Sequence, residues 1–351
     1  MSHILLAMSG GVDSSVAASL LLEQGFRVSG VYMRHSLQVK PEEENDAVKA
    51  AEHLGITLHR LDIDEPFREI VNRFTDDYLA GHTPNPCALC NRKIKFGNLI
   101  DFADSMGVEM FATGHYARII CDKSGEHSLF RAADANKDQS YLLYGIERDR
   151  LKRIRFPLGE LSKAEVRDKA ASIGLHVSTK KDSQEICFVQ PHEHVEFIRS
   201  RRSGVDTAGN FVSTDGKILG KHDGFERFTI GQRKGMKVGF GKRIFVIRIE
   251  PETKNVVIGS EEELAVDRLV AGETNWLADI PKNQSFRCDV KIRYRNAAAP
   301  ATVIASDNRI EVSFESPKYG VATGQIAACY QNDKLLGGGV ILQTYTHNRL
   351  V

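Results

Sequence analysis

Two cysteines are the first residues of the chain whose type and spacing point to chemistry. Cys87 and Cys90 lie in the stretch TPNPCALCNRKIKF (83–96), after two prolines and before a run of basic residues. A Cys-x-x-Cys pair fits half of a zinc site, a redox pair, or a nucleophile whose partner lies elsewhere. The pair alone does not distinguish these three kinds of site.

A second candidate site is SGGVDSS, residues 9–15, which follows a short apolar run and precedes an amphipathic segment. A glycine turn between a strand and a helix places backbone N–H groups and the helix dipole where they bind anions. Gly10 and Gly11 allow close approach to a phosphate, and Ser14 and Ser15 add hydroxyl donors. Asp13 caps the helix or helps to hold a metal ion. The alternative is an ordinary glycine turn, since the stretch lacks the Gly-Lys-Ser/Thr ending of a Walker A loop.

These two segments lie in a region where strand and helix patterns alternate. Helices are predicted over 16–25, 42–55, 66–81 and 91–107, and strands over 3–9, 28–34, 56–64 and 109–117. The alternation predicts a Rossmann-like parallel sheet with helices on both faces. From about residue 203, short alternating runs between Gly-rich turns predict two small β domains. We expect domains at 1–202, 203–268 and 269–351.

Composition restricts the class of protein. The chain has 351 residues and six cysteines, which favours reduced thiols and a cytoplasmic location over a disulfide framework. There is no signal-peptide pattern and no apolar run of about 20 residues, so we expect no membrane partner. Net charge is only +1, but residues 199–248 contain 12 basic and 4 acidic residues. This basic middle segment predicts a polyanionic partner, and the alternative is ordinary surface charge.

SGGVDSS resembles the pyrophosphate loop (PP-loop) of the ATP pyrophosphatases, which split ATP into AMP and pyrophosphate to activate a carbonyl oxygen. The resemblance implies adenylation, with ATP and Mg²⁺ as cofactors. It also implies that Met33 meets adenine through its backbone and that the TGHYA segment meets ATP through Gly114. The implied ATP contacts are Ala7, Met8, Ser9, Gly10, Gly11, Val12, Asp13, Ser14, Ser15, Met33 and Gly114.

Further motifs occur in order: NPCALCNRKIKF, ATGHYAR, KDQSYLL, KDSQEICF and FTIGQRKG. The series is similar to that of the tRNA-specific 2-thiouridylases and covers nearly the whole chain. The resemblance implies a sulfurtransferase that adenylates and then thiolates carbon 2 of the wobble uridine in tRNA. It also implies a sulfur donor protein, either a cysteine desulfurase or a persulfide relay protein.

By the same resemblance, Cys187 carries a persulfide. Cys90 either attacks it to free sulfide or resolves it as a disulfide. A predicted helix N-terminus and the cations of Arg92, Lys93 and Lys95 favour the Cys90 thiolate; the case for Cys187 is weaker.

Cys87 departs from the family pattern, because many members have aspartate there. Three roles stay open for it. Cys87 is an accessory to a persulfide route, or it joins Cys90 and Cys187 around a [4Fe–4S] cluster with one open iron. In the third, the cysteines hold zinc with a residue such as His82 as the fourth ligand.

The resemblance also implies contacts with tRNA. Asn85, Pro86 and Cys87 would lie against the target base, while a core histidine is the alternative for His115. Arg293 and Arg295 are expected on one face of a strand in KIRYRN, where both suit phosphates. Asp138 is also a candidate for Mg²⁺. The full set of expected tRNA contacts is Asn85, Pro86, Cys87, His115, Lys137, Asp138, Gln139, Arg293, Arg295 and Gln325.

Two functions other than thiolation fit part of the sequence. One is another ATP pyrophosphatase, such as a ligase that amidates a nucleotide, which would need neither cysteine motif. The other is an RNA-binding protein with a relic nucleotide site, which the intact SGGVDSS loop argues against. Cys121, Cys288 and Cys329 match no motif and are expected to be structural.

Overall fold

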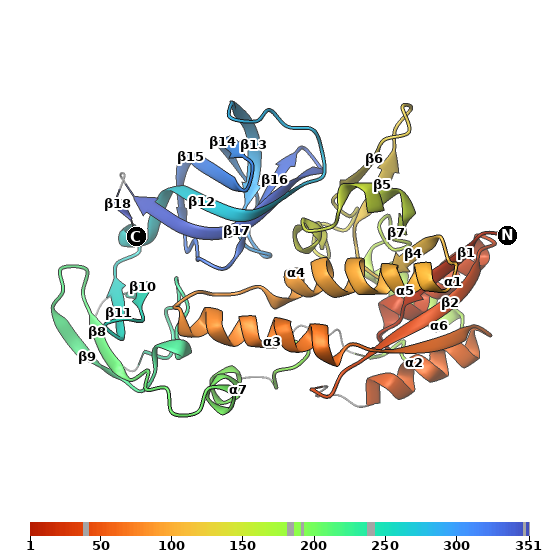
Figure 1. Cartoon of the computed structure of the whole chain (residues 1–351), viewed down its shortest axis with the longest axis horizontal. Coiled ribbons are helices and arrows are strands. Elements are labelled where there is room, and N and C mark those ends of the chain that lie inside the picture. The colour runs from red at the N-terminus through yellow and green to blue at the C-terminus, as the bar shows by residue number, and fades with distance from the viewer. Residues whose placement is uncertain (38–41, 181–185, 191–192, 237–242, 347–348, 351) are drawn as a thin grey trace.

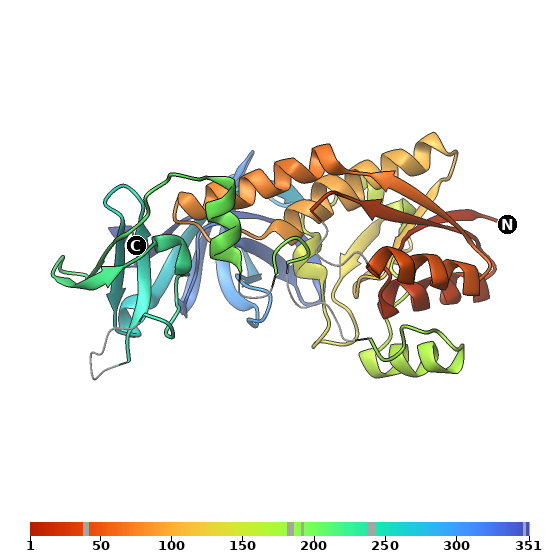
Figure 2. The same ribbon diagram turned by 90° about the horizontal axis from the view of Figure 1, so that it is seen from below.

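The computed structural model describes residues 1–37, 42–180, 186–190, 193–236, 243–346 and 349–350. The described residues form three sheets (Figure 1). The molecule is elongated, with the N-terminal parallel sheet at one end and the β8–β11 sheet at the other (Figure 2). In the part of the chain that is described, no helix has the length and apolar character needed to span a bilayer.

Five parallel strands form the first sheet, in the order β3-β2-β1-β4-β7. Leu5 of β1 packs with Phe111 of β4 on one face, whereas Ile4 and Leu6 belong to the core on the other face, as the alternation of side chains along a strand requires. The predicted Rossmann-like sheet is confirmed. The strands are β1 (His3–Ala7), β2 (Arg27–Arg34), β3 (Thr57–Asp62), β4 (Met110–Thr113) and β7 (Ile154–Arg155).

Helices cover both faces of this sheet. Buried residues of α1, α2 and α6 share one core with Ile4, and those of α4, η1 and α5 share the other with Leu5. Ser162 and Glu165 form a capping box that fixes the start of α6. The helices are α1 (Val12–Glu23), α2 (Glu42–His53), α3 (Asp64–Leu79), α4 (Pro86–Cys90), the π-helix η1 (Asn91–Asn98), α5 (Leu99–Ser105), α6 (Lys163–Ser172) and α7 (His194–Arg201).

Residues after α7 form a four-stranded sheet in the order β10-β11-β8-β9. Phe211 and Phe228 pack edge to face in its core, with ring centroids 5.1 Å apart. Its strands are β8 (Gly209–Val212), β9 (Ile218–His222), β10 (Phe245–Glu250) and β11 (Asn255–Gly259).

The last β domain is a closed barrel of six strands, because β12 pairs with both β15 and β17. The two predicted β domains are thus confirmed, although the exact boundaries stay predictions; 268/269 falls inside β12. The barrel strands are β12 (Ala265–Trp276), β13 (Ser285–Lys291), β14 (Ala299–Ser306), β15 (Arg309–Tyr319), β16 (Ile326–Gln331) and β17 (Lys334–Thr346), and β17 also pairs with β18 (Arg349–Leu350).

The N-terminal domain and the barrel share a sheet. The hairpin of β5 (Arg118–Cys121) and β6 (His127–Phe130) leaves the N-terminal domain, and Phe130 pairs with Lys334 of β17. Short 3₁₀ helices complete the connections: η2 (Ser140–Leu143), η3 (Arg148–Arg153), η4 (Phe225–Arg227) and η5 (Glu262–Leu264). Sequence patterns did not reveal this joint sheet, since each hairpin strand is only four residues long.

Candidate active site

The turn between β1 and α1, here called the anion turn, is the candidate phosphate site and is built from backbone. Gly11 is the N-cap of α1, and no side chain caps the helix there. The first N–H groups of the helix therefore lack a side-chain acceptor, which is the arrangement that binds anions. Gly10 has a φ of +70°, and a Cβ there would overlap the carbonyl oxygen of Glu43 in α2. Only glycine fits this position.

The serine hydroxyls of this turn are used within it. Ser14 and Ser15 are buried, and their Oγ atoms donate to the carbonyl oxygen of Gly11 at 3.2 and 2.9 Å. These hydroxyls close the turn, and their contact with a phosphate stays a prediction. Val12 and the side chain of Met8 are also buried. These two residues therefore offer a ligand their backbone.

The other expected ATP contacts lie at the edge where the parallel strands end, which is where such sheets bind ligands. Ala7 ends β1 and Met33 lies at the end of β2, while Ser9 is exposed in the turn. Gly114 follows β4, and a Cβ there would lie 2.9 Å from the backbone nitrogen of Ser14. Gly114 thus lets this strand end pack against the turn. The contacts of these residues with ATP stay predictions.

The Asp13 side chain does not cap the helix, and it has two hydrogen-bond partners. Its Oδ1 accepts hydrogen bonds from the hydroxyl of Tyr116 at 2.8 Å and from Nζ of Lys163 at 2.7 Å. Sequence reasoning missed both partners. Tyr116 belongs to the ATGHYAR motif, which was a usable signal, whereas nothing in the sequence around Lys163 pointed to the turn.

The helix that carries Cys90 begins earlier than predicted. α4 starts at Pro86, and the Asn85 side chain caps it by accepting a hydrogen bond from the Ala88 N–H at 3.1 Å. Cys87 is thus the second residue of the helix and Cys90 the fifth. The predicted start at 91 is wrong because Asn followed by Pro is itself a helix-start signal. The dipole acts mainly within the first turn, so it favours the Cys87 thiolate more than the Cys90 thiolate.

Cys187 comes to this helix from a distant part of the chain. The adjacent Phe188 packs edge to face against Phe67 and Phe74 of α3, with ring centroids 5.5 and 5.3 Å apart. Ile186 and Cys90 pack against the same cluster. Burial raises the pKa of Cys187, and the charges of Cys90 and Cys87 raise it further, as nearby like charges do. The structure thus brings together the three cysteines that the motifs singled out.

The surroundings of these thiols oppose ionisation. Burial within the protein raises the pKa of Cys90 to about 11 and that of Cys187 to about 12, and it also raises the pKa of Cys87. Lys95 lowers all three, but less than burial raises them. The predicted thiolate character of Cys90 is therefore wrong in this conformation. Although Cys87 and Cys187 touch solvent and Cys90 is partly exposed, the protein around each sulfur removes most of its hydration.

This environment predicts the pH dependence of thiol modification. Because the thiolate is the nucleophile, alkylation of Cys90 by iodoacetamide is expected to rise about tenfold per pH unit from about pH 7 to pH 10 without a plateau. Peptide mass spectrometry would measure the rate. In denaturant, the alkylation rate of Cys90 should level off near pH 9, as the rate for an ordinary thiol does. A plateau below about pH 8 in the folded protein would contradict the raised pKa.

The same pKa values affect stability. The pKa of Cys90 is 9.0 when unperturbed and about 11 in the folded chain. The protonated thiol therefore contributes stability that is fully present below about pH 9 and is lost as the pH rises through 11.

The cysteines were also considered as metal ligands. Within the described residues, which include all three cysteines, no group of three or more His, Cys, Asp or Glu side chains is placed to hold a metal ion. His82, the candidate fourth ligand for zinc, bonds through Nδ1 to the Thr323 hydroxyl at 2.8 Å. As placed, the described side chains therefore form neither a cluster site nor a zinc site. The Thr323 bond by itself does not argue against zinc, because it leaves Nε2 of His82 to bind a metal.

Comparison with known proteins decides the family. Three family models match in order: a tRNA methyl transferase HUP domain over residues 2–191, a tRNA methyl transferase PRC-barrel domain over 196–260 and an aminomethyltransferase beta-barrel domain over 266–341. The chain is 46% identical over 347 residues to the tRNA-specific 2-thiouridylase MnmA of Syntrophotalea carbinolica, covering 97% of this chain and 98% of the relative. It belongs to the tRNA-specific 2-thiouridylase family. The resemblance found in the motifs is confirmed.

A second relative agrees over a similar length. MnmA of Rhodopirellula baltica is 44% identical over 393 residues, covering 99% of this chain and 98% of that protein. Among solved structures, a 4-thiouridine synthetase–RNA complex with bound ATP aligns with 21% identity and a TM-score of 0.38, over 53% of this chain and 44% of that one. That likeness is too weak to bear on the site.

Two of the expected tRNA contacts, His115 and Asp138, are buried. His115 is only 8% exposed, bonds through Nδ1 to the Thr113 hydroxyl at 2.7 Å and lies near Phe96. Burial holds its pKa well below the usual value. This placement fits the alternative of a core histidine. Asp138 is buried as well, and its Oδ1 accepts from the Ser140 N–H at 3.1 Å; its contacts with tRNA and Mg²⁺ stay predictions.

Asp138 shares its loop with Lys137 and Gln139, two expected tRNA contacts that are more exposed than Asp138. Lys137 is partly exposed. The amide oxygen of Gln139 accepts from the Tyr116 N–H at 2.9 Å. This bond connects the loop to the segment that follows Gly114. The tRNA contacts of Lys137 and Gln139 stay predictions.

The expected tRNA contacts in the barrel domain lie in different surroundings. β13 ends at Lys291, so Arg293 and Arg295 lie in the following loop and the predicted shared strand face is wrong. Arg293 donates to the carbonyl oxygen of Ile230 at 2.7 Å and so joins the barrel to the β8–β11 domain, whereas Arg295 is exposed. Gln325 donates through Nε2 to the carbonyl oxygen of Thr83 at 2.8 Å. It therefore holds the segment that enters α4, and its contact with tRNA stays a prediction.

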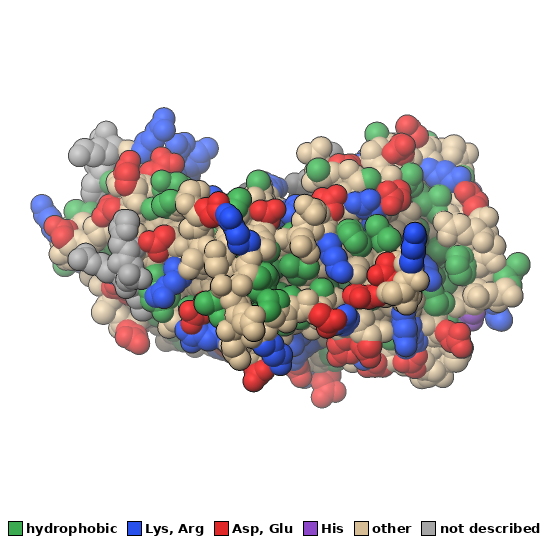
Figure 3. All heavy atoms as spheres, turned by 90° about the horizontal axis from the view of Figure 1, so that it is seen from above, with side chains coloured by type: hydrophobic (Ala, Val, Ile, Leu, Met, Phe, Trp, Pro, Cys, Tyr) green, Lys and Arg blue, Asp and Glu red, His purple; other side chains and the backbone are tan. Residues whose placement is uncertain are grey.

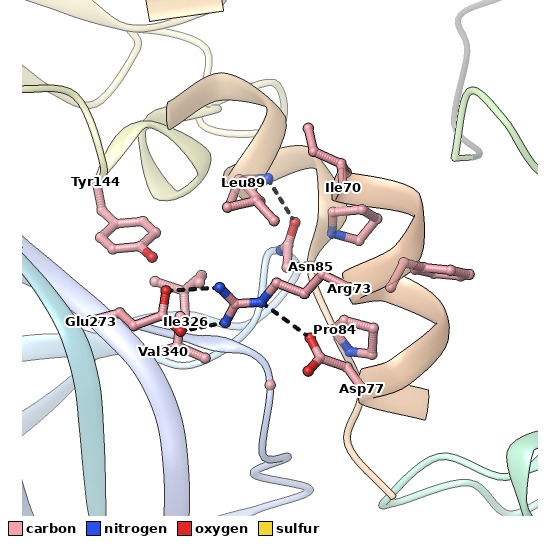
Figure 4. A pocket seen from close by; sticks show the side chains of 14 residues that line it. Ile70, Arg73, Asp77, Pro84, Asn85, Leu89, Tyr144, Glu273, Ile326 and Val340 are labelled. Carbon is pink, nitrogen blue, oxygen red and sulfur yellow. Dashed lines mark hydrogen bonds and ion pairs between the residues drawn. The ribbon is translucent and has the colours of Figure 1, made fainter. Parts of the chain in front are cut away.

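A small pocket lies where α3, the start of α4 and the barrel meet (Figure 4). Arg73 of α3 forms a two-pronged ion pair with Glu273 of β12 and a second contact with Asp77 at 3.6 Å. Asn85, the helix cap, lines the same pocket. Its volume of about 30 Å³ has room for about two water molecules. The ion pair fastens the barrel to α3.

Figure 3 shows the charge on one face of the molecule. On the face drawn in Figure 3, basic and acidic side chains alternate and no large region has a single sign. Within the basic middle segment, Arg199 pairs with Glu226 and Arg202 with Asp76. Arg233 and Lys234 of the FTIGQRKG motif are exposed, and they remain the candidates for RNA phosphate in this segment.

Proposed function

We propose that this protein replaces the C2 oxygen of the wobble uridine in tRNA by sulfur, at the expense of ATP. In the first step the uridine O2 attacks the α-phosphate, and pyrophosphate leaves with the electron pair of the broken P–O bond. The O2 atom, a poor leaving group as a carbonyl, becomes part of a good one as an AMP ester. Sulfur then attacks C2, and AMP leaves with the original oxygen.

Cys187 would supply that sulfur as a persulfide received from a donor protein, either a cysteine desulfurase or a persulfide relay protein. In one route the terminal sulfur attacks C2, and the Cys90 thiolate then attacks the Cys187 sulfur to release the thiolated base. In the other, Cys90 attacks first and frees hydrosulfide, which attacks C2. Both routes leave a Cys90–Cys187 disulfide, which a cellular thiol must reduce before the next turnover.

The observation that carries this proposal is the meeting of Cys90 and Cys187 next to the edge of the sheet where the anion turn lies. Met33, at the end of β2, packs against the cluster that contains Cys90 and Ile186. An adenylating site and a pair of thiols on one edge are what thiolation needs. A nucleotide-amidating ligase would need no such thiols.

Mg²⁺ would accompany ATP, held mainly by phosphate oxygens and water. Asp13 is the carboxylate of the turn that is close enough to contribute, although Lys163 and Tyr116 already occupy its Oδ1. The metal would offset phosphate charge. Free thiols at all six cysteines suit the reducing cytoplasm, where we place the protein.

The direct test is nucleoside mass analysis of unmodified tRNA incubated anaerobically with the protein, Mg-ATP and a persulfide donor. A 2-thiouridine peak that requires ATP is expected. Cleavage of ATP to AMP without that peak would mean that activation occurs but that the acceptor or sulfur assignment is wrong. Absence of any tRNA-dependent exchange between ATP and pyrophosphate would favour an RNA-binding protein with a relic site.

The role of Cys87 has a separate test. We propose a persulfide route without iron, with Cys87 as an accessory residue. Anaerobically purified protein is then expected to be fully active without iron, and Cys87→Ser is expected to keep activity within about tenfold. About four irons per chain, lost together with activity in Cys87→Ala, would instead establish the [4Fe–4S] cluster alternative.

A further inference from the structure

The anion turn contains no lysine, yet two lysines from elsewhere in the chain reach it. Lys163 contacts Asp13 at one end of the turn, with Nζ 2.7 Å from Oδ1. Lys180 contacts the other end, with Nζ 3.3 Å from the carbonyl oxygen of Gly10. We infer that Lys163 and Lys180 bind the β- and γ-phosphates of ATP from the two ends of the turn, and that they stabilise the departing pyrophosphate.

Lys163 is held at the turn by the fold. It is the first residue of α6, where the Ser162 cap fixes the helix start, and its N–H donates to Asp134 at 3.0 Å. The side chain is only 12% exposed. An ammonium so far from bulk water is costly unless it is paired, which Asp13 provides. The chain thus places a positive charge beside the first turn of α1.

Lys180 is positioned by a second carboxylate. Its Nζ lies 2.6 Å from Oδ2 of Asp46 in α2, and His176 lies 3.3 Å from Oδ1 of the same residue. α2 is also the helix whose Glu43 carbonyl oxygen lies against Gly10. Lys180 therefore belongs to the wall of the turn on the side of α2.

The charges of the site show why these lysines are needed. A triphosphate that approaches the turn meets the carboxylates of Asp13 and Asp46, which repel it. Backbone N–H groups and a helix dipole supply only partial positive charge. A lysine ammonium has three donors, so each lysine can keep its carboxylate and also donate to a phosphate oxygen. When the bond between the α-phosphorus and the bridging oxygen breaks, the negative charge grows on pyrophosphate, where fixed cations stabilise it most.

This inference rests on the proposed use of ATP, and its test separates the two. Dissociation constants for ATP and for AMP are measured with Lys163→Met and Lys180→Met in the full chain. Each variant is expected to lose about 10- to 100-fold in ATP affinity while AMP affinity changes less than about twofold, because AMP has no β- or γ-phosphate. Wild-type affinity for ATP, or equal losses for ATP and AMP, would overturn the inference.

Controls address folding and the function itself. Lys169→Met lies on the same helix and removes an exposed pair with Glu23, so both affinities should match the wild type. Lys163→Arg keeps the charge beside Asp13 and is expected to recover most of the ATP affinity even if Lys163→Met is unstable; failure to recover would count against the inference. Wild-type protein that binds ATP but makes no 2-thiouridine would refute the proposed function and leave this inference standing.

Discussion

Replacing Cys187 by serine is expected to lower 2-thiouridine formation by at least about 1000-fold. A serine hydroxyl cannot carry a persulfide, and no sulfur would then reach C2. The structure holds Cys187 beside Cys90 through Phe188, so serine should change neither the fold nor the ATP site. Exchange between ATP and pyrophosphate is therefore expected to continue in the presence of tRNA. Mass analysis of the tRNA nucleosides and a radiolabel exchange assay would measure the two steps separately.

Cys90→Ser should behave in the same way when turnover is followed, since both routes require its thiolate. Cys121→Ser is the matched control, because Cys121 is exposed at the end of β5 and outside the site. That exposure corrects the expectation that Cys121 is structural, whereas Cys288 and Cys329 are buried in the barrel as expected. Full activity of Cys187→Ser would end the persulfide assignment and would favour a nucleotide-amidating ligase.

Alanine at Gly10 is expected to destabilise the protein by about 2 kcal/mol or more. The residue has a φ of +70°, and the added Cβ would overlap the Glu43 carbonyl oxygen, which is backbone and cannot turn aside. The turn would have to move away from α2, so ATP binding should be lost along with stability. Chemical denaturation and calorimetric titration with ATP would measure the two effects.

The neighbouring glycine is the control for this prediction. A Cβ at Gly11 meets only the Ser9 hydroxyl, at 3.4 Å, and Gly11 has an ordinary φ of −101°. Gly11→Ala is therefore expected to keep wild-type stability within about 0.5 kcal/mol, while the methyl group at the helix N-cap lowers ATP affinity about tenfold. Equal stability of the two variants would show that the space around Gly10 is not the constraint inferred here.

The sequence by itself determined the fold class, the anion turn and the family. These features depend on local patterns: alternation of strand and helix, a pair of glycines between them, and short motifs that keep their spacing in any conformation. The β domains were likewise predictable from short alternating runs. The Asn-Pro start of α4 was also present in the sequence, and a capping argument applied at Asn85 would have found it.

Only the tertiary structure decided which side chains are placed to contact a ligand. His115 and Asp138 looked like ligand contacts, but the folded chain buries both side chains. Lys163 and Lys180 looked ordinary, but α6 and the segment after it bring them to the turn. Burial and pairing are set by contacts between segments that are far apart in sequence, and such contacts leave no local pattern. For the same reason the pKa of Cys90, which its basic neighbours suggested would be low, is raised by the protein packed around it.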